Sequence, residues 1–146
     1  IQNAYNLVNR GFEIGLSEVA MHEQVGLLAY SPLAQGTLTG KYLGGQMPQG
    51  SRLALFGDGP LMMRYKGDKT QQAIEMYVNL AKKYEIDPAQ LAIQFCNIQP
   101  FVTSTIIGAT TMEQLKTCID SVDLDITKEI INEIRSIHKE IPNPAP

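Results

Sequence analysis

The sequence has few cysteines and no long apolar run. The first feature argues against a disulfide-rich or cysteine-ligated metal protein, and the second argues against a membrane-spanning one. Cys96 and Cys118 are the only cysteines among 146 residues, and neither stands in a CxxC or other metal-ligand spacing. Two isolated thiols are typical of a reduced, cytoplasmic protein. No stretch approaches the roughly 20 apolar residues of a membrane span, and no signal peptide is visible. We therefore expect a cytoplasmic protein that does not contact a membrane.

A strong positive charge is also missing. The formal net charge is -3 and the isoelectric point is about 5.3, which argues against binding to nucleic acid or to a membrane surface. The charge is uneven, because residues 41–69 carry a net charge of +3 and the rest of the chain -6. The bases of this segment are Lys41, Arg52, Arg64, Lys66 and Lys69, and its acids are Asp58 and Asp68. A basic loop in an acidic chain suits a small anionic ligand, although a solvated loop with incidental charges has the same composition.

Three apolar stretches, residues 1–8, 25–30 and 102–107, have the composition of buried strands, and each precedes a helical pattern. Helical spacing of apolar residues predicts helices over 12–23 and 68–85, one from Pro88, one after Thr110 or Thr111, and one over 127–141. Strands that alternate with helices predict an α/β protein with a parallel sheet covered by helices.

The helical spacing also predicts which side chains are buried. The expected buried faces consist of Phe12, Leu16, Val19 and Ala20, then Ala73, Tyr77, Leu80, Ala81 and Tyr84, then Leu91, Ala92, Phe95 and Ile98, and finally Ile130, Ile134, Ile137 and Ile141. Asp68 with Gln71 has the spacing of a capping box, and Asp87 before Pro88 is typical of a helix start. The last five residues, PNPAP, predict an extended and loose tail.

Two glycine-rich nucleotide motifs are excluded by counting residues. The segment GTLTGK, residues 36–41, has three residues between its glycines where a P-loop has four, and Tyr42 follows the lysine in place of Ser or Thr. No G-x-G-x-x-G of a Rossmann turn is present. A dinucleotide must therefore be held in another way.

The segment AYSPLAQGTLTGKY places Tyr30 and Ser31 at the carboxyl end of a predicted parallel strand. Chemistry in α/β proteins is located at these ends, and a tyrosine there offers a flat face to an aromatic ring. The following turn through Gly36 can direct backbone N–H groups at an anion, with Lys41 close behind. A plain strand-ending turn with a buried tyrosine and a solvated lysine remains the alternative.

The segment IIGATTMEQL repeats this pattern after the third strand. Gly108 lets a ligand approach the backbone closely, and a new helix begins near Thr110 or Thr111 with Glu113 or Gln114 as the partner in a capping box. Helix capping alone needs the same residues. Two anion-suited strand ends and a basic loop containing Arg52 together indicate a ligand with more than one phosphate.

Other candidate groups are weak. His22 and His138 lie on predicted helices and are interpreted as surface residues, and Cys96 falls on an apolar helix face. Ser31 is not in a G-x-S-x-G motif. Neither paired carboxylates nor metal ligands stand at the strand ends, so the sequence predicts no metal site.

Three parallel strands are too few to close a barrel, and an open three-stranded parallel sheet leaves a bare edge. Because residue 1 already falls inside a predicted strand, we expect further strands upstream and interpret residues 1–146 as part of a larger barrel. A second possibility is a natural partial barrel that self-associates as a homo-oligomer to cover its edge.

The segments IQNAYNLVNR, LLAYSPLAQGTLTGKY and IIGATTMEQLKT resemble, in order and separation, the sixth, seventh and eighth strand regions of an aldo-keto reductase. The resemblance covers nearly the whole chain and is strongest to the branch of Tas-like reductases and potassium-channel β-subunits. It implies the C-terminal part of a (β/α)₈ TIM barrel that binds NADP(H) and reduces aldehydes or ketones. A channel-β-like regulatory subunit that senses cofactor and binds a partner protein is the alternative.

The resemblance also implies roles for individual residues. Gln2 would contact the nicotinamide carboxamide and Tyr30 would stack on the nicotinamide ring. The pyrophosphate would be lined by Ser31, Leu33, Gln35 and Gly36, with Lys41 closing over it. Arg52 would reach toward the adenosine end, and Gly108, Thr110 and Gln114 would bind the 2′-phosphoribose and adenine side. Cys118 stands where the family commonly has Asn, and a thiol cannot supply an amide's paired donor and acceptor.

The family's catalytic Asp, Tyr, Lys and His come from its first four strand regions, which this sequence does not contain. We therefore assign no catalytic residue and expect this chain alone to be inactive.

Overall fold

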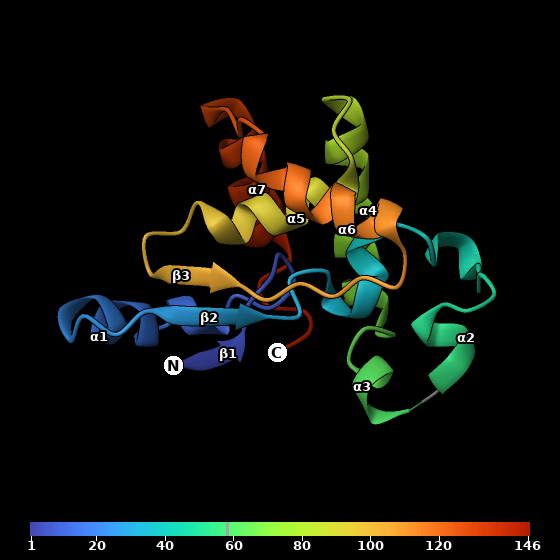
Figure 1. Cartoon of the computed structure of the whole chain (residues 1–146), viewed down its shortest axis with the longest axis horizontal. Helices are drawn as coiled ribbons and strands as arrows, with labels where there is room; N and C mark the ends of the chain where they lie inside the picture. Colours follow the sequence, from blue (N-terminus) through green and yellow to red (C-terminus); the bar gives the residue numbers. More distant parts are fainter. Residues whose placement is uncertain (58) are drawn as a thin grey trace.

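The computed structural model describes residues 1–57 and 59–146. Asp58, one of the two acids of the basic segment, lies outside the described residues. The strands are β1 (Gln2–Ala4), β2 (Leu27–Tyr30) and β3 (Val102–Thr105), and they alternate with helices (Figure 1). The α-helices are α1 (Leu16–His22), α2 (Arg52–Phe56), α3 (Pro60–Met63), α4 (Asp68–Lys83), α5 (Pro88–Asn97), α6 (Met112–Asp120) and α7 (Lys128–Glu140). Short 3-10 helices are η1 (Gly11–Glu13), η2 (Ala34–Thr39), η3 (Leu43–Gly45) and η4 (Ser121–Asp123).

The three strands form one parallel sheet, as the sequence predicts, and their order in it is β1-β2-β3. Gln2 pairs with Leu28 and Ala4 with Tyr30, and the register between β2 and β3 shifts at Leu27 and Leu28. Because all strands run the same way, the loops that follow them begin at one edge of the sheet. The two predicted binding loops therefore start side by side.

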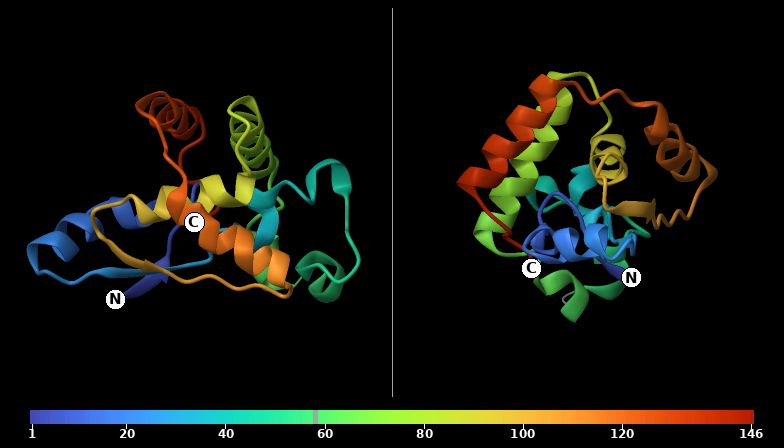
Figure 2. Two further views of the ribbon diagram at one scale, coloured as in Figure 1. Left: turned by 45° about the horizontal axis from the view of Figure 1, so that its top comes forward. Right: turned by 90° about the vertical axis from the view of Figure 1, so that its left-hand side faces the viewer.

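The two faces of the sheet differ in burial. Leu27 and Ala29 are fully buried in the core, whereas Leu28 and Tyr30, which alternate with them, are each 39% exposed. Helix α5 packs against β3, and α4 lies beside α7 (Figure 2). One face of the sheet thus packs on helices, and the other is open in this chain.

Helix α7 and the α5 interface supply much of the core. Ile130, Ile134, Ile137 and Ile141 are all at most 8% exposed, as their spacing predicts. Around the end of β1, the Tyr5 ring stacks on Phe95 at a centroid distance of 5.6 Å and meets the edge of Phe101 at 5.3 Å. In the described part of the chain no helix is long and apolar enough to cross a membrane.

The first strand is shorter than predicted. β1 ends at Ala4, because Asn6 and Asn9 exchange backbone hydrogen bonds of 3.0 and 3.1 Å and close a turn. Asn side chains that bond to nearby backbone groups favour turns over strands. Leu7 and Val8 are nevertheless at most 1% exposed, so the apolar run reflects burial in the core and not an extended strand.

The first predicted helix is broken in two. Gly15, with φ at 86°, separates η1 from α1, and a left-handed residue cannot continue a helix. Phe12 and Ala20 are buried as predicted, but Leu16 and Val19 are 44% and 57% exposed. Their apolar side chains lie on a face that the described residues do not cover. The predicted burial of Leu16 and Val19 is therefore wrong for this chain.

Two further predictions need correction. Asp68 does not cap α4, since Gly67 occupies the N-cap position and the Gln71 amide instead donates to the Tyr65 carbonyl. Ile98 follows the last residue of α5 and is 40% exposed. By contrast, Asp87 caps α5 as predicted, accepting from the backbone N–H groups of Ala89 and Gln90.

The C-terminal tail is docked and not loose. Ala145 is 1% exposed, and its N–H donates to the Val8 carbonyl at 3.1 Å. Thr70 donates to the Pro144 carbonyl at 2.7 Å, and the Asn143 side chain accepts from the Arg10 N–H at 2.7 Å. The proline-rich composition predicts the extended backbone but does not reveal these anchors. The tail lies over the turn that follows β1.

Candidate functional site

Most of the predicted site residues lie on the two loops that follow β2 and β3, whereas Gln2 begins β1, Arg52 begins α2 and Cys118 lies on α6. Tyr30 is the last residue of β2, and the Ile106 N–H, just past β3, donates to the Ala29 carbonyl at 2.8 Å. This bond holds the beginning of the second loop against the end of β2. The loops after Tyr30 and after Thr105 therefore share one edge of the sheet (Figure 1).

Gln2 and Tyr30 lie on the open face of the sheet. Gln2 pairs with Leu28, which precedes Tyr30 by two residues, and residues two apart on a strand point to the same side. The Tyr30 side chain is therefore available to a flat ligand at the strand end. This arrangement is compatible with the predicted pairing of Gln2 and Tyr30 around one ring.

The turn after Tyr30 has an unusual backbone. Ser31, Ala34 and Gln35 have φ values of 55°, 48° and 59°, and Gly36 has 89°. Left-handed residues other than glycine are uncommon and cluster at ligand-binding and active sites, where the surrounding structure holds them. Leu33, with φ at -92°, precedes left-handed Ala34, and such a change of hand is found in anion-binding concavities of N–H groups. Within this turn the N–H groups of Ala34 and Gly36 donate to the Ser31 and Leu33 carbonyls, at 2.9 and 2.8 Å. The prediction of an anion-binding turn is compatible with this geometry.

Lys41 and Arg52 fold back over the turn. A Cβ added to Gly36 would lie 3.1 Å from both Cε and Nζ of Lys41, so the lysine covers the glycine. The Lys41 ammonium is also 5.2 Å from the centre of the Tyr42 ring. Arg52 Nη1 donates to Gln35 Oε1 at 2.5 Å, and Gln35 Nε2 lies 3.4 Å from Ser31 Oγ. Two cations thus stand at the turn.

The second loop forms its own small network. Thr111 caps α6 by accepting from the Gln114 N–H at 3.2 Å. The Gln114 side chain accepts from both the N–H and the hydroxyl of Thr110, at 3.0 and 3.1 Å. Nothing lies within 4 Å of a Cβ added to Gly108, so the chain's own packing does not require glycine there. The residues cap the helix and are exposed, as both the capping and the binding interpretations predict.

Cys118 differs from its neighbours in this loop and helix. It is only 6% exposed, and burial together with the nearby Asp87 carboxylate raises the pKa of its thiol. A buried neutral thiol offers little to a polar ligand. In the described residues no hydrogen bond joins the second loop to the Ser31–Arg52 group, so the structure forms two adjacent clusters.

Sequence reasoning missed Asn6. This residue is fully buried, and its Nδ2 donates to the Ser31 carbonyl at 2.9 Å. The available signal was the Asn-x-x-Asn spacing of Asn6 and Asn9 directly after an apolar strand, which is typical of a side-chain-stabilised turn.

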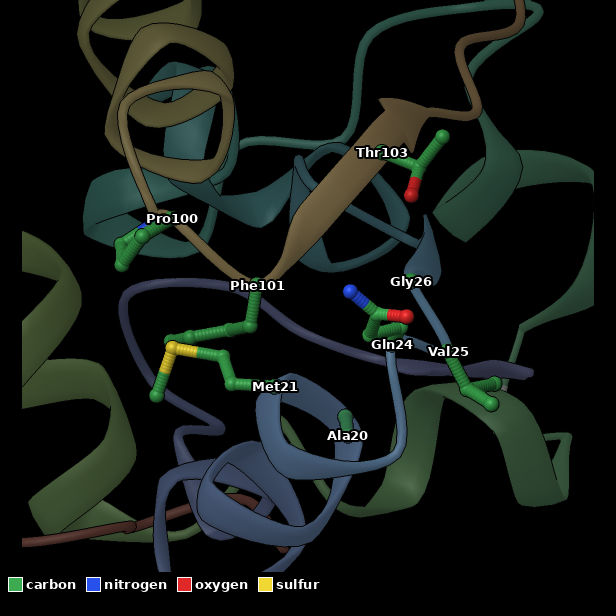
Figure 3. Close-up of a pocket in the computed structure, with 8 residues that line it drawn as sticks. All are labelled: Ala20, Met21, Gln24, Val25, Gly26, Pro100, Phe101 and Thr103. Carbon is green, nitrogen blue, oxygen red and sulfur yellow. The ribbon is translucent and has the colours of Figure 1, made fainter.

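A cavity lies elsewhere, away from the predicted binding loops. It has a volume of about 260 Å³ and is lined by the end of α1, the segment before β2 and the start of β3 (Figure 3). Met21, Gly26 and Phe101 are among its lining residues. This is the amino end of the strands, opposite to the predicted binding loops. The candidate site is an open edge and not an enclosed cavity.

A partly buried ionic cluster lies next to the turn after β1. Arg10 forms a bidentate pair with Glu13 at 2.6 and 2.8 Å, and the Tyr5 hydroxyl donates to the same carboxylate at 2.6 Å. Burial alone would raise the pKa of Glu13, but the bonds from Arg10 and Tyr5 hold it below its ordinary value. Burial and the Arg10 guanidinium lower the pKa of His138. His138 is thus partly buried, contrary to its interpretation as a surface residue, whereas His22 is exposed.

Metal chemistry has no support in the described part of the chain. No group of three or more His, Cys, Asp or Glu side chains there is arranged to hold a metal ion. Cys96 is completely buried, and burial raises the pKa of its thiol.

Residues 1–139 match the sequence family described as "Aldo/keto reductase family". Over 146 residues the chain is 51% identical to "Protein tas" of Escherichia coli strain K12, covering all of this chain and 41% of that protein. It is 34% identical over 125 residues to the L-glyceraldehyde 3-phosphate reductase of the same strain, covering 84% of this chain and 36% of that protein.

Two further similarities extend the comparison. A probable voltage-gated potassium channel subunit beta of Oryza sativa subsp. japonica is 35% identical over 120 residues, which cover 81% of this chain and 37% of that protein. The solved structure of the glycerol dehydrogenase AKR11B4 from Gluconobacter oxydans superposes with a TM-score of 0.71 at 23% identity, covering 98% of this chain and 43% of that one. The chain thus spans less than half the length of these proteins.

Proposed function

Because the chain belongs to the aldo/keto reductase family, a family of oxidoreductases, we propose that it is the NADP(H)-binding part of a reductase of aldehydes or ketones. Its three strands would be the sixth to eighth of a (β/α)₈ barrel. The spans of 41% and 43% of its longer relatives are compatible with that position. The substrate would be a small carbonyl compound.

The observation that carries the proposal is the turn after Tyr30. Three left-handed residues other than glycine occur within five positions, at the end of a parallel strand and beneath two cations. Strain of this kind costs roughly 1–3 kcal/mol per residue and persists where the surrounding structure holds it for a function. A concave backbone with Lys41 above it fits a diphosphate, and Arg52, which is bonded to Gln35, would extend the site toward the adenosine end.

Different groups of residues would bind the nicotinamide, the pyrophosphate and the adenosine end of the cofactor. Tyr30 and Gln2, on the open face, would hold the nicotinamide, and the turn from Ser31 to Gly36 would hold the pyrophosphate under Lys41. Arg52 and the Gly108–Gln114 loop would face the adenosine end. Cys118 is the weakest of the proposed contacts because its thiol is buried.

When bound, NADPH supplies the hydride that reduces a carbonyl carbon. The residues of this chain would orient the nicotinamide, bind its charged tail and screen the phosphates. The proton for the carbonyl oxygen requires an acid placed at the substrate. We assign no such acid here, and Tyr30 is proposed as a stacking residue, so the chain alone should bind cofactor without turnover.

A fluorescence titration tests the proposal. NADPH emission is followed as the chain is added, and a reactive aldehyde is then supplied while absorbance of the reduced nicotinamide is recorded. We expect weak but saturable binding and no oxidation of NADPH. Absence of saturable binding would refute the assignment of a cofactor site, and clear turnover would refute the assignment of catalysis to other sequence.

A second candidate function is that of a regulatory subunit that senses cofactor. The similarity to a potassium-channel β-subunit favours it, since the same binding loops lie within the matched region. Substrate-dependent turnover by the full-length protein that contains this sequence would favour the enzyme. Cofactor binding without turnover by that protein would favour the regulatory subunit.

A further inference from the structure

Asn6 is buried directly behind the candidate site. It is 0% exposed and follows the end of β1 by two residues. Its Oδ1 accepts from the N–H groups of Val8 and Asn9 at 3.0 and 2.9 Å, which stabilises the turn after the strand. These two hydrogen bonds to Oδ1 would by themselves account for either Asn or Asp at position 6, since both side chains have an oxygen that can accept them.

The Nδ2 group of the same side chain forms a hydrogen bond to a different segment, the turn after β2. Asn6 Nδ2 donates to the Ser31 carbonyl at 2.9 Å, and the Ala34 N–H donates to that carbonyl at 2.9 Å as well. Ser31 is the first left-handed residue of the binding turn, with φ at 55°. Its carbonyl is thus held from two sides, by the turn itself and by a side chain 25 residues earlier.

The Asn6 turn is itself braced by the docked tail. Ala145 donates to the Val8 carbonyl and Asn143 accepts from the Arg10 N–H. A left-handed serine is unfavourable in isolation and persists only when its neighbours determine its conformation. Asn6 is such a neighbour, because its side chain is fully buried and its turn is held in place by the C-terminal tail.

We propose that Asn6 is a positioning residue of the binding site, which fixes the left-handed conformation of Ser31 and thereby the anion-binding turn. The consequence for ligand affinity rests on the proposed function, whereas the consequence for the turn does not. Asn6 acts through Ser31 and is not assigned a contact with the cofactor.

Asn6→Asp removes the Nδ2 donor to the Ser31 carbonyl and keeps the oxygen that accepts from Val8 and Asn9. A carboxylate retains acceptors for Val8 and Asn9 but places an acceptor against the Ser31 carbonyl. Asn9→Asp is the matched control, because Asn9 is 8% exposed in the same turn and its side chain accepts from Gly11 and not from the binding turn. Both variants introduce one charge at a buried position.

Amide hydrogen exchange of Ala34 and Gly36 is measured by NMR without ligand, followed by an NADPH titration of each variant. We expect Asn6→Asp to accelerate exchange at both amides about tenfold and to raise the NADPH dissociation constant about fivefold to tenfold, as loss of one hydrogen bond does. Asn9→Asp should change neither by more than about twofold. Equal effects of the two variants, or unchanged exchange in Asn6→Asp, would overturn the proposal.

Ser31→Gly provides a second test, since glycine adopts positive φ without steric cost. Added to Asn6→Asp, it should recover part of the lost melting temperature, and more than it recovers in Asn9→Asp. If Asn6→Asp alone does not fold, the double variant should regain a cooperative transition, and failure to do so would contradict the proposal. Faster exchange without NADPH binding by the wild-type chain would refute the proposed function while upholding the role of Asn6.

Discussion

Gly36 carries two constraints that a side chain would violate. Its φ of 89° is left-handed, and an added Cβ would lie 3.1 Å from the Lys41 side chain. The same region contains three left-handed residues that are not glycine, so the turn already holds unfavourable backbone. Glycine at this position adds no further steric cost to the turn, because it has no Cβ, and it leaves the backbone open to a ligand.

Gly36→Ala should therefore lower the free energy of unfolding by about 1–2 kcal/mol, the cost of a left-handed alanine. Gly108→Ala is the matched control, since Gly108 lacks positive φ and has open space around a new Cβ. It should change stability by less than about 0.5 kcal/mol. Urea unfolding of the two variants measures both values. A similar loss in both would contradict the strain assigned to Gly36.

Arg52 is expected to distinguish the two nicotinamide dinucleotides. Arg52→Ala removes the guanidinium that we propose faces the adenosine end, and a charged hydrogen bond to a 2′-phosphate contributes roughly 1.5–3 kcal/mol. NADPH affinity should fall by about tenfold or more, and NADH affinity by less, in paired fluorescence titrations of the full-length protein. Arg64→Ala, an exposed arginine of the same basic segment, should change neither affinity appreciably. Equal losses for the two cofactors would argue that Arg52 does not contact the 2′-phosphate.

Helix α7 and the tail after it behave as one unit. The helix buries Ile130, Ile134 and Ile137 against the core, and Ile141 follows directly after it. The tail forms two hydrogen bonds to the turn after β1 and a third to Thr70 on α4. This places the last residues of the chain behind the binding edge. The tail thus contributes to the support of the loop that contains Asn6.

Deleting residues 142–146 should lower the free energy of unfolding by about 2–4 kcal/mol, because each lost hydrogen bond contributes about 0.5–1.5 kcal/mol. Deleting Pro146 alone retains all three bonds and should have little effect. Thermal unfolding followed by circular dichroism measures the difference. A tail deletion that leaves the melting temperature unchanged would show that the tail is not docked in solution.

The elements best predicted from the sequence are those with a strong local pattern. Spacing of the isoleucines predicts α7, and Asp87 before Pro88 predicts the start of α5. The failures have tertiary causes. Leu16 and Val19 have a core-like pattern but lie on an uncovered face, and the turn at Asn6 depends on side-chain hydrogen bonds that spacing alone does not reveal.

The candidate site was predictable in part for similar reasons. Strand ends and cap residues predict where the two loops lie, and both loops are at the predicted edge of the sheet. The left-handed conformations of Ser31 and Ala34 were not predictable, because neither residue type favours positive φ. Burial of Cys118 likewise depends on how α6 packs and not on its own sequence.

At the scale of the whole molecule, the partly buried ionic cluster of Arg10, Glu13 and His138 should make the stability of the fold depend on pH. The pKa of His138 is lowered by burial and by Arg10, and the pKa of Glu13 is lowered by its bonds to Arg10 and Tyr5. A group whose pKa is lower in the folded state favours unfolding as the pH falls, since the unfolded chain binds its proton more tightly. Both groups therefore destabilise the fold toward acid.

For His138 the loss should begin near the ordinary value of 6.5 and continue until the lowered pKa is passed, and Glu13 should add to it below the ordinary value of 4.5. Melting temperatures between pH 4 and pH 8 test this expectation. His138→Gln should flatten the decline just below pH 6.5, whereas His22→Gln, at an exposed position, should leave it unchanged. A decline of the same size in His138→Gln would contradict the role of His138.

The proposed function requires that the edge formed by the carboxyl ends of β2 and β3 binds the dinucleotide. An NMR titration of the ¹⁵N-labelled chain with NADPH measures this binding residue by residue. We predict saturable shifts at residues 30–41 and 108–114, with little change at the cavity lined by Met21 and Phe101. Shifts confined to that cavity, or no shifts at saturating NADPH, would show that this edge is not the dinucleotide site.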